Sequence, residues 1–418
     1  MKIKNIYARE ILDSKGHPTV EAEVILEDGI KAMGQVPSGA STGSTEAVEL
    51  RDGDSKRYNG KGVLKAVENV KTKIRDVLVG QNAYNQKKID QLMIDADGTE
   101  NKASLGGNAI VAVSMAVCRA ASLSQKIPLY KYFGQISGNK EFVLPQPQIL
   151  ILEGGKHGNW STDIQEYFVI PKKEKFESFA EKLRVGTEIF HSLEKILKEK
   201  NYSTGVGYEG AFMPKQIKSN EEAFQLMLEA IEKAGYKPEE EIVLGLDAAS
   251  SEFYQDGHYV LKSGNGIKLT PREWTNKVIK WTEKYPIWSM EDIHAEKDWD
   301  EWVYFTSKVG SHIQVVGDDL LTTNVKRIQK AIDLKAVNSV LIKLNQIGTV
   351  TETINAIKLS DSAGFTTVVS HRGGETNDDM IADLVVGTSS WQSKFGGPDR
   401  GERLAKYNRL LRIEEKLT

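Results

Sequence analysis

The sequence predicts two domains, a C-terminal α/β domain built as a β/α (TIM-like) barrel and a smaller α+β domain before it. The chain has 418 residues, which is more than one hydrophobic core usually organises, and a β/α barrel takes about 250 of them. After residue 140, apolar β-branched runs alternate with amphipathic helical patterns, as in parallel sheets. The segment 134–147, with Gly138, Pro145 and Pro147, is typical of a boundary. We therefore expect domains at 1–138 and 139–418.

The first domain opens with strand patterns and continues with helical ones. Apolar residues follow strand spacing over 4–12, 19–26 and 31–36, and Asp28-Gly29 between the last two is a hairpin signal. Helical periodicity then covers 64–78, 86–95 and 107–124. A few strands followed by a run of helices predicts an α+β layout.

Five apolar runs of the second domain end in an ionisable side chain. The runs are EIVLGLD, PIWSMED, IQVVGDD, SVLIK and TTVVSHR, and their charged ends are Asp247, Glu291, Asp318, Lys343 and His371. Successive members lie 44, 27, 25 and 28 positions apart, and the last three spacings match one β/α unit. Strand C-termini of a barrel meet at one face, so these side chains are expected to converge there. A doubly wound open sheet is the alternative, but no glycine-rich dinucleotide fingerprint follows a strand.

Three carboxylates in this set predict a cation. Asp247, Glu291 and Asp318 would raise one another's pKa if they met without a counter-charge. Oxygen ligands without cysteine suit a hard ion, and Mg²⁺ is the expected one. Lys343 beside it is a candidate general base, since burial and nearby cations depress the pKa of a lysine. The alternative is that these charges are solvated loop residues or salt-bridge partners.

Three polar loops add candidate residues. The loop GGKHGNWSTDIQE carries His157 and ends at Gln165 and Glu166, and GVGYEGAFMP places Glu209 between glycines. Near the N-terminus, VPSGASTG (36–43) is a small-residue loop able to close over a ligand and to offer backbone N–H groups to an anion. A histidine or glutamate in such a loop is more often simply solvated.

Composition excludes several classes of function. The formal charge of −3 does not suggest a nucleic-acid partner. The one cysteine, Cys118, lies in an apolar helical run, which indicates a buried thiol in a reducing compartment. The N-terminus lacks the apolar stretch of a signal peptide, and no run reaches the roughly 20 apolar residues of a membrane span. We expect a cytoplasmic protein without a membrane partner.

Many stretches of the chain closely resemble the enolase (phosphopyruvate hydratase) family. In order from residue 11 to 415 they are ILDSKGHPTVEAEV, VPSGASTG, DGTENK, SLGGNAIVAVSMAVCRAA, IPLY, DIQEY, LGLDAASSEFY, SMED, VVGDDLLTTN, LIKLNQIGTVTETI, VVSHRGGET and GERLAKYNRLLRIEE. The resemblance implies reversible dehydration of 2-phosphoglycerate to phosphoenolpyruvate, two Mg²⁺ ions and a homodimer.

The resemblance also implies a role for individual residues. Asp247, Glu291 and Asp318 would hold the first metal, and Ser41 the second together with the substrate phosphate. Lys343 would take the α-proton, and Glu209, helped by Glu166, would assist departure of the hydroxyl. The residues that would contact substrate are His157, Gln165, His371, Arg372, Gly373, Lys394 and Ala40.

The sequence departs from the family's pattern around the substrate. Gly373 replaces a serine that contacts phosphate, Glu153 replaces the asparagine of an Asn-Gly-Gly loop, and Tyr208 and Ala211 flank Glu209. Three functions follow as alternatives. They are an ordinary enolase, a paralogue that uses enolate chemistry on another phosphorylated or phosphonylated acid, as carboxyphosphonoenolpyruvate synthase does, and a non-catalytic binding protein.

Overall fold

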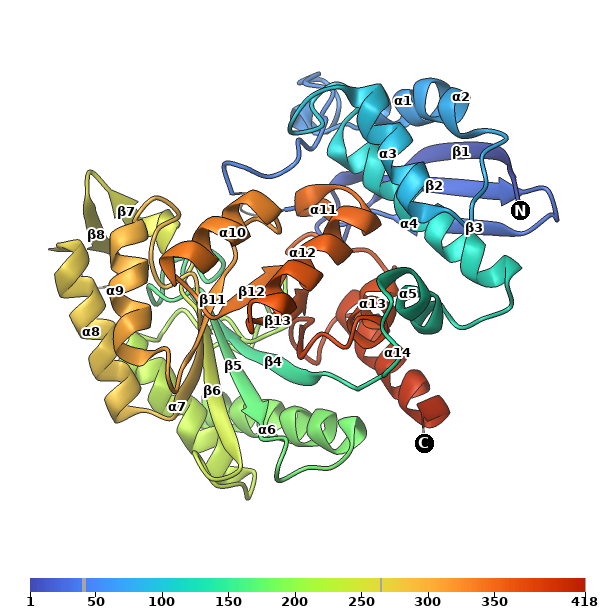
Figure 1. The fold of residues 1–418 in the computed structure, drawn as a ribbon. Helices are drawn as coiled ribbons and strands as arrows, with labels where there is room; N and C mark the ends of the chain where they lie inside the picture. Colours follow the sequence, from blue (N-terminus) through green and yellow to red (C-terminus); the bar gives the residue numbers. More distant parts are fainter. Residues whose placement is uncertain (40–42, 264, 418) are drawn as a thin grey trace.

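The computed structural model describes residues 1–39, 43–263 and 265–417. Its N-terminal part pairs an antiparallel sheet with helices (Figure 1). The strands are β1 (Ile3–Leu12), β2 (Pro18–Leu26) and β3 (Lys31–Gln35), and the helices are α1 (Leu64–Asn69), α2 (Arg75–Leu78), α3 (Gln86–Asp97), α4 (Gly107–Ser124) and α5 (Leu129–Ser137). The predicted helix over 64–78 is interrupted by a π-helical turn at Val70–Ile74. Gly29, at φ +87°, forms the predicted hairpin turn between β2 and β3.

Eight strands close into a barrel, which confirms the predicted fold class and excludes the open sheet. Around the barrel they are β4 (Gln146–Glu153), β5 (Glu166–Pro171), β6 (Ile242–Asp247), β10 (Ile287–Glu291), β11 (Gln314–Gly317), β12 (Ser339–Ile342), β13 (Thr366–Ser370) and β14 (Gln392–Lys394). The helices that follow the strands are α6 (Phe179–Glu199), α7 (Asn220–Lys233), α8 (Pro271–Lys284), α9 (Trp299–Val309), α10 (Val325–Leu334), α11 (Leu344–Ile347), α12 (Val350–Ser362), α13 (Met380–Gly387) and α14 (Gly401–Leu417). A short hairpin sheet of β7 (Tyr254–Gln255), β8 (His258–Leu261) and β9 (Ile267–Leu269) follows β6.

One strand contradicts the expectation of an all-parallel sheet. Strand β5 runs antiparallel to both of its neighbours, β4 and β6. The loop 154–165 joins β4 to β5 without a helix, and parallel neighbours need a crossover connection of a dozen or more residues, usually helical. The chain therefore turns back, and β5 begins at the face where the other barrel strands end.

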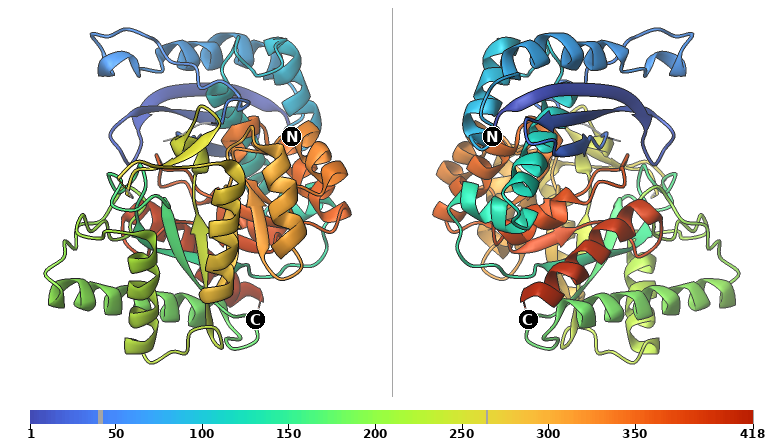
Figure 2. Two further views of the ribbon diagram at one scale, coloured as in Figure 1. Left: turned by 90° about the vertical axis from the view of Figure 1, so that its left-hand side faces the viewer. Right: turned by 90° about the vertical axis from the view of Figure 1, so that its right-hand side faces the viewer.

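The N-terminal domain lies across one end of the molecule, above the barrel in both views of Figure 2. Helix α4 packs against β2 and β3 on one side and against α11 and α12 of the barrel on the other. By length and composition α4 is apolar enough to cross a membrane, but 83% of it is buried inside the protein, as is usual for a central core helix.

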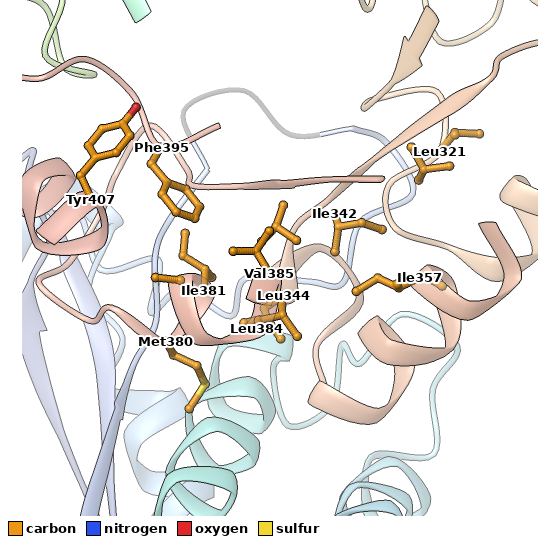
Figure 3. Packing of buried hydrophobic residues seen from close by; sticks show 14 of the residues in the cluster. Leu321, Ile342, Leu344, Ile357, Met380, Ile381, Leu384, Val385, Phe395 and Tyr407 are labelled. Carbon is orange, nitrogen blue, oxygen red and sulfur yellow. The ribbon is translucent and has the colours of Figure 1, made fainter. Parts of the chain in front are cut away.

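Apolar side chains fill the layer between the barrel strands and the outer helices. Ile342 of β12, Ile357 of α12, Leu384 of α13 and Phe395 belong to this apolar cluster (Figure 3), and all four are almost fully buried. Interiors packed in this way resist deformation. The barrel is therefore a rigid frame for the polar side chains at its mouth.

Candidate active site

Four acidic side chains form a row across adjacent barrel strands. Glu153 of β4 pairs in register with Glu166 of β5, Glu166 pairs with Asp247 of β6, and Asp247 pairs with Glu291 of β10. Residues in register on neighbouring strands point to the same face of a sheet. All four are at most 5% exposed, so the row is a concentration of buried carboxyl groups.

The other predicted site residues complete the same mouth of the barrel. Asp318 directly follows β11, Lys343 follows β12, His371 follows β13, and Lys394 is the last residue of β14. One pocket is lined by residues from all these strand ends and from the predicted loops, including His157, Gln165, Glu166, Glu209, Asp247, Asp318, Lys343, His371, Arg372, Gly373 and Lys394. Chain topology thus brings these side chains together although they lie far apart in sequence.

The Lys394 ammonium group lies at the centre of the acidic row. Its Nζ atom is 2.8 Å from both carboxylate oxygens of Glu291, 2.9 Å from Asp247 Oδ2 and 3.0 Å from Glu166 Oε2. Burial alone would lower the pKa of Lys394, but the surrounding carboxylates raise it well above its usual value. Burial raises the pKa of Glu291, and the nearby Asp247 raises it further. Lys394 is thus the counter-charge of three members of this row, Glu166, Asp247 and Glu291.

Lys343 contacts Asp318, and the contact has a consequence for the predicted base. Lys343 Nζ donates to Asp318 Oδ2, while Gln346 Nε2 donates to Asp318 Oδ1 at 2.8 Å. Burial lowers the pKa of Lys343, but Asp318 outweighs that effect, and the pKa is raised from its usual value. The expectation of a depressed pKa is therefore wrong for this arrangement, because a carboxylate in direct contact favours the ammonium form.

The chemistry of the donors fits a hard divalent cation. Asp247, Glu291 and Asp318 have only oxygen atoms as possible ligands. Each makes an ion pair with a lysine ammonium group, which shows that the site stabilises positive charge. A second group, Asp292, Asp318 and Asp319, places one oxygen of each within 4.8 Å of the others. In that group both Asp292 oxygens accept backbone N–H groups, from Asp318 at 2.9 Å and Asp319 at 2.8 Å. Among the described residues this separation is also met by His157, Glu166 and Glu209, and not by the predicted set of Asp247, Glu291 and Asp318.

A second cluster of carboxyl groups surrounds His157. His157 Nδ1 lies 3.9 Å from Glu166 Oε1 and 3.9 Å from Glu209 Oε1. Burial raises the pKa of Glu166 well above its usual value, and the neighbouring Glu209 adds to this. Burial opposes ionisation of Glu209 as well, but His371 favours it, and the pKa of Glu209 lies well below its usual value. A proton shared by this pair is therefore held more readily by Glu166 than by Glu209.

The tautomer of His371 follows from its neighbours. Arg403 Nη1 lies 2.7 Å from His371 Nδ1, and a guanidinium group can only donate. The proton of neutral His371 is therefore on Nε2, which lies 3.2 Å from Glu209 Oε2. Burial lowers the pKa of His371 to about 3, so the ring is neutral and its Nε2 proton is on the side of the Glu209 carboxylate.

Arg372 is held by a residue that the sequence did not reveal. Its Nη1 and Nη2 atoms lie 2.9 and 3.2 Å from the Glu46 carboxylate, and Nη1 donates to Asn345 Oδ1 at 3.1 Å. Glu46 belongs to the N-terminal domain and lies in an irregular segment, so no periodicity marks it. Arg403 was missed for a different reason. It lies within helix α14, and the segment GERLAKYN was interpreted as part of the family's scaffold and not of its site.

Asp292 and Asp319 were also missed as site residues, although a signal was present. Each is the second acid of a pair at a strand end, Glu291-Asp292 and Asp318-Asp319. Two of the predicted ligand residues, Ala40 and Ser41, lie outside the described residues. Gly373 lines the pocket, and its carbonyl accepts from Arg403 Nη2 at 2.8 Å.

Comparison with known families agrees with this architecture. The family model described as the enolase N-terminal domain matches residues 3–133, and the model described as the enolase C-terminal TIM barrel domain matches residues 141–418. The chain belongs to the enolase family. Enolase-family membership supports an enzyme of the enolase superfamily that acts as a lyase, and the acidic groups at the barrel mouth are able to hold a metal ion.

Proposed function

We propose that this enolase-family protein is a Mg²⁺-dependent lyase that reversibly dehydrates 2-phosphoglycerate to phosphoenolpyruvate. The observation that carries the proposal is that Lys343 and Asp318 line the same pocket as Glu166 and Glu209. A base and a proton-carrying carboxyl on opposite sides of one pocket suit an elimination, which removes a proton at one carbon and a hydroxyl at the next.

Lys343, Glu209 and Glu166 would each take part in one of the bond changes of the elimination. Lys343 takes the proton from C2 of the substrate, the C2–C3 double bond forms, and the C3–O bond breaks. Glu209 and Glu166 assist departure of the hydroxyl, which leaves as water with a proton from this pair, and the raised pKa of Glu166 suits it to hold that proton. Lys343 can act as a base only after its contact with Asp318 is given up, because that contact favours the ammonium form.

Asp247, Glu291 and Asp318 would hold the first Mg²⁺, and Ser41 would contribute to the second. A divalent cation in this position stabilises the negative charge that develops when a proton is removed next to a carboxylate. Arg372, Lys394, His371, His157, Gln165 and the backbone near Ala40 and Gly373 would bind the anionic substrate. We further propose a cytoplasmic homodimer whose small-molecule partner is a phosphorylated or phosphonylated carboxylic acid.

The test is direct. Purified protein with Mg²⁺ is expected to form phosphoenolpyruvate from 2-phosphoglycerate, followed by its ultraviolet absorbance, and to stop when EDTA removes the metal. Lys343→Ala is the matched negative control. Absence of product from the native protein at saturating Mg²⁺ would overturn the proposal.

A second candidate is a paralogue that performs the same enolate chemistry on a bulkier or phosphonylated acid. The observation that favours it is the altered surroundings of the substrate, where Gly373 lacks the family's hydroxyl and Glu153 adds a buried carboxyl beside Glu209. The two candidates are separated by comparing kcat/KM for 2-phosphoglycerate with that for a carboxyphosphonate analogue. A higher value for the analogue favours the paralogue.

A further inference from the structure

The fourth acid of the row, Glu153, has a place of its own in the structure. It is the last residue of β4 and is fully buried. Among the described residues it makes no hydrogen bond or ion pair with Asp247, Glu291 or Asp318, the proposed metal ligands. It points instead to the turn 207–211, which carries Glu209.

One oxygen of Glu153 holds that turn by its backbone. Glu153 Oε1 accepts from the N–H of Glu209 at 3.1 Å and from the N–H of Ala211 at 3.2 Å. The carboxyl group also packs against Gly207, where an added Cβ would lie only 2.2 Å from Glu153 Oε2. The turn therefore has space for this carboxyl only because residue 207 is glycine, and the carboxyl fixes the backbone on which Glu209 sits.

The second oxygen faces the leaving-group side of the site. Glu153 Oε2 has no hydrogen-bond partner among the described residues and lies 4.0 Å from His157 Nδ1, which also has none. His157 is thus surrounded by three carboxyl groups, since Glu166 and Glu209 each lie 3.9 Å from the same atom. Because Glu153 Oε2 and His157 Nδ1 are both buried and 4.0 Å apart, a small movement of either side chain would bring them into hydrogen-bond distance.

Burial, followed by the charge of Glu209, raises the pKa of Glu153 to about 8, whereas Arg403 opposes the shift. The charged and titratable groups around Glu153 come from several elements. His157 lies in the β4–β5 loop, Glu166 begins β5, and Glu209 lies in the turn. The others are His371 after β13, Lys394 on β14, Arg403 on α14, and Lys15, which interacts with Glu209. At neutral pH Glu153 is therefore a neutral acid beside an ionised Glu209, and it adds no second negative charge there.

We propose that Glu153 is a positioning residue that places Glu209 against His371 and His157 by holding the turn 207–211. The inference rests on the proposed function, in which Glu209 assists departure of the hydroxyl. A glutamate at the end of β4 reaches under this turn and accepts two N–H groups with one oxygen, which joins the strand to the turn. Glu153 touches no reacting atom and acts through Glu209.

The test compares three variants by steady-state kinetics on 2-phosphoglycerate, with Mg²⁺ affinity measured by calorimetry. Glu153→Gln keeps an oxygen for both N–H groups and is expected to retain kcat within about fivefold. Glu153→Ala removes the acceptor and is expected to lose kcat on the order of a hundredfold, since a displacement of about 1 Å has that effect. Mg²⁺ affinity stays unchanged in both. The matched control is Glu301→Gln, which changes a buried carboxylate of α9 that is bound to Arg272 away from the site.

The pH profile is a readout that a merely structural role would not move. Above pH 8 ionised Glu153 places a second negative charge beside Glu209, so KM for the anionic substrate is expected to rise in the native protein and not in Glu153→Gln. Superimposable profiles overturn the proposal, as does Glu153→Ala with kcat within fivefold of native or Glu153→Gln as impaired as Glu153→Ala. If Glu153→Ala does not fold, the pH profile of Glu153→Gln decides.

Hydrogen exchange separates failure of this inference from failure of the proposed function. A native protein without turnover overturns the function only. The contact between Glu153 and the turn 207–211 is then tested by hydrogen exchange of the peptide that contains Glu209 and Ala211. The exchange is measured by mass spectrometry in Glu153→Gln and in the control Glu301→Gln. Unaltered slow exchange in Glu153→Gln, together with faster exchange in Glu153→Ala or Gly207→Ala, supports the proposal that Glu153 holds the turn. Equal exchange in all variants overturns it.

Discussion

Replacing Lys394 by methionine removes the counter-charge of three buried carboxylates and should destabilise the protein strongly in the absence of metal. Lys394 is 2% exposed, and Glu166, Asp247 and Glu291 lie within 3.0 Å of its ammonium group. Breaking a buried ion pair by removing one partner costs about 3–5 kcal/mol. At the low end of about 2 °C per kcal/mol for a large domain, the thermal midpoint falls by about 6–10 °C.

The assay is thermal unfolding at pH 8 in EDTA, with Lys198→Met as the matched control. Lys198 makes an ion pair of similar length with Glu194, 2.6 Å, but its side chain is 61% exposed, so its loss costs about 0–1 kcal/mol. The pKa of Glu291 is already raised in the folded state. A folded-state pKa above the unfolded value gives a penalty that is absent below about pH 4.5 and grows as the pH rises.

The Lys394→Met deficit is therefore expected to be small at pH 4.5, full at pH 8, and reduced by added Mg²⁺, which restores positive charge to the same carboxylates. Equal midpoint shifts for Lys394→Met and Lys198→Met at pH 8 in EDTA would refute the assignment of Lys394 as the counter-charge. So would a deficit that does not depend on pH.

Four further predictions follow from the site. Lys343→Ala should abolish exchange of the substrate α-proton, read by NMR in deuterated water, and leave Mg²⁺ binding intact; exchange at the native rate would end the assignment of Lys343 as base. Asp318→Asn should weaken Mg²⁺ binding at least tenfold, since a charged ligand is lost, and calorimetry that finds native affinity would contradict it. Arg372→Lys should raise KM by about ten- to a hundredfold, because a fork that also pairs with Glu46 becomes a point charge; an unchanged KM argues against a substrate role. Gly373→Ser should raise kcat/KM for 2-phosphoglycerate by about ten- to a hundredfold if a hydroxyl bonds the phosphate, and no gain would leave the glycine without a part in phosphate selection.

The parts of the site that could be predicted are those that a strand presents at its end. Asp247, Glu291, Asp318 and Lys343 were found because each closes an apolar run, and a barrel brings such ends together. Lys394 was not found in this way. Its strand, β14, has three residues and no apolar run, so only the family resemblance marked it.

The parts that could not be predicted depend on long-range packing. Glu46 reaches Arg372 across 326 positions of sequence, and nothing in the pattern near residue 46 indicates such a partner. The antiparallel direction of β5 was missed because the segment DIQEY was interpreted as the end of a loop. Glu153 was noticed as a departure from the family, but its contact with the turn 207–211 exists only in three dimensions.

The reversed direction of β5 means that the site residues at the mouth of the barrel are attached to the sheet in two different ways. Because β4 ends and β5 begins at the same face, both anchors of the loop 154–165 are site residues, Glu153 and Glu166. The proposed ligand residues Asp247, Glu291 and Asp318 lie instead at the ends of β6, β10 and β11, outside this loop. A change within the loop 154–165 is therefore expected to alter the side of the mouth that carries Glu153 and Glu166 without interrupting the strands that carry the three proposed ligand residues.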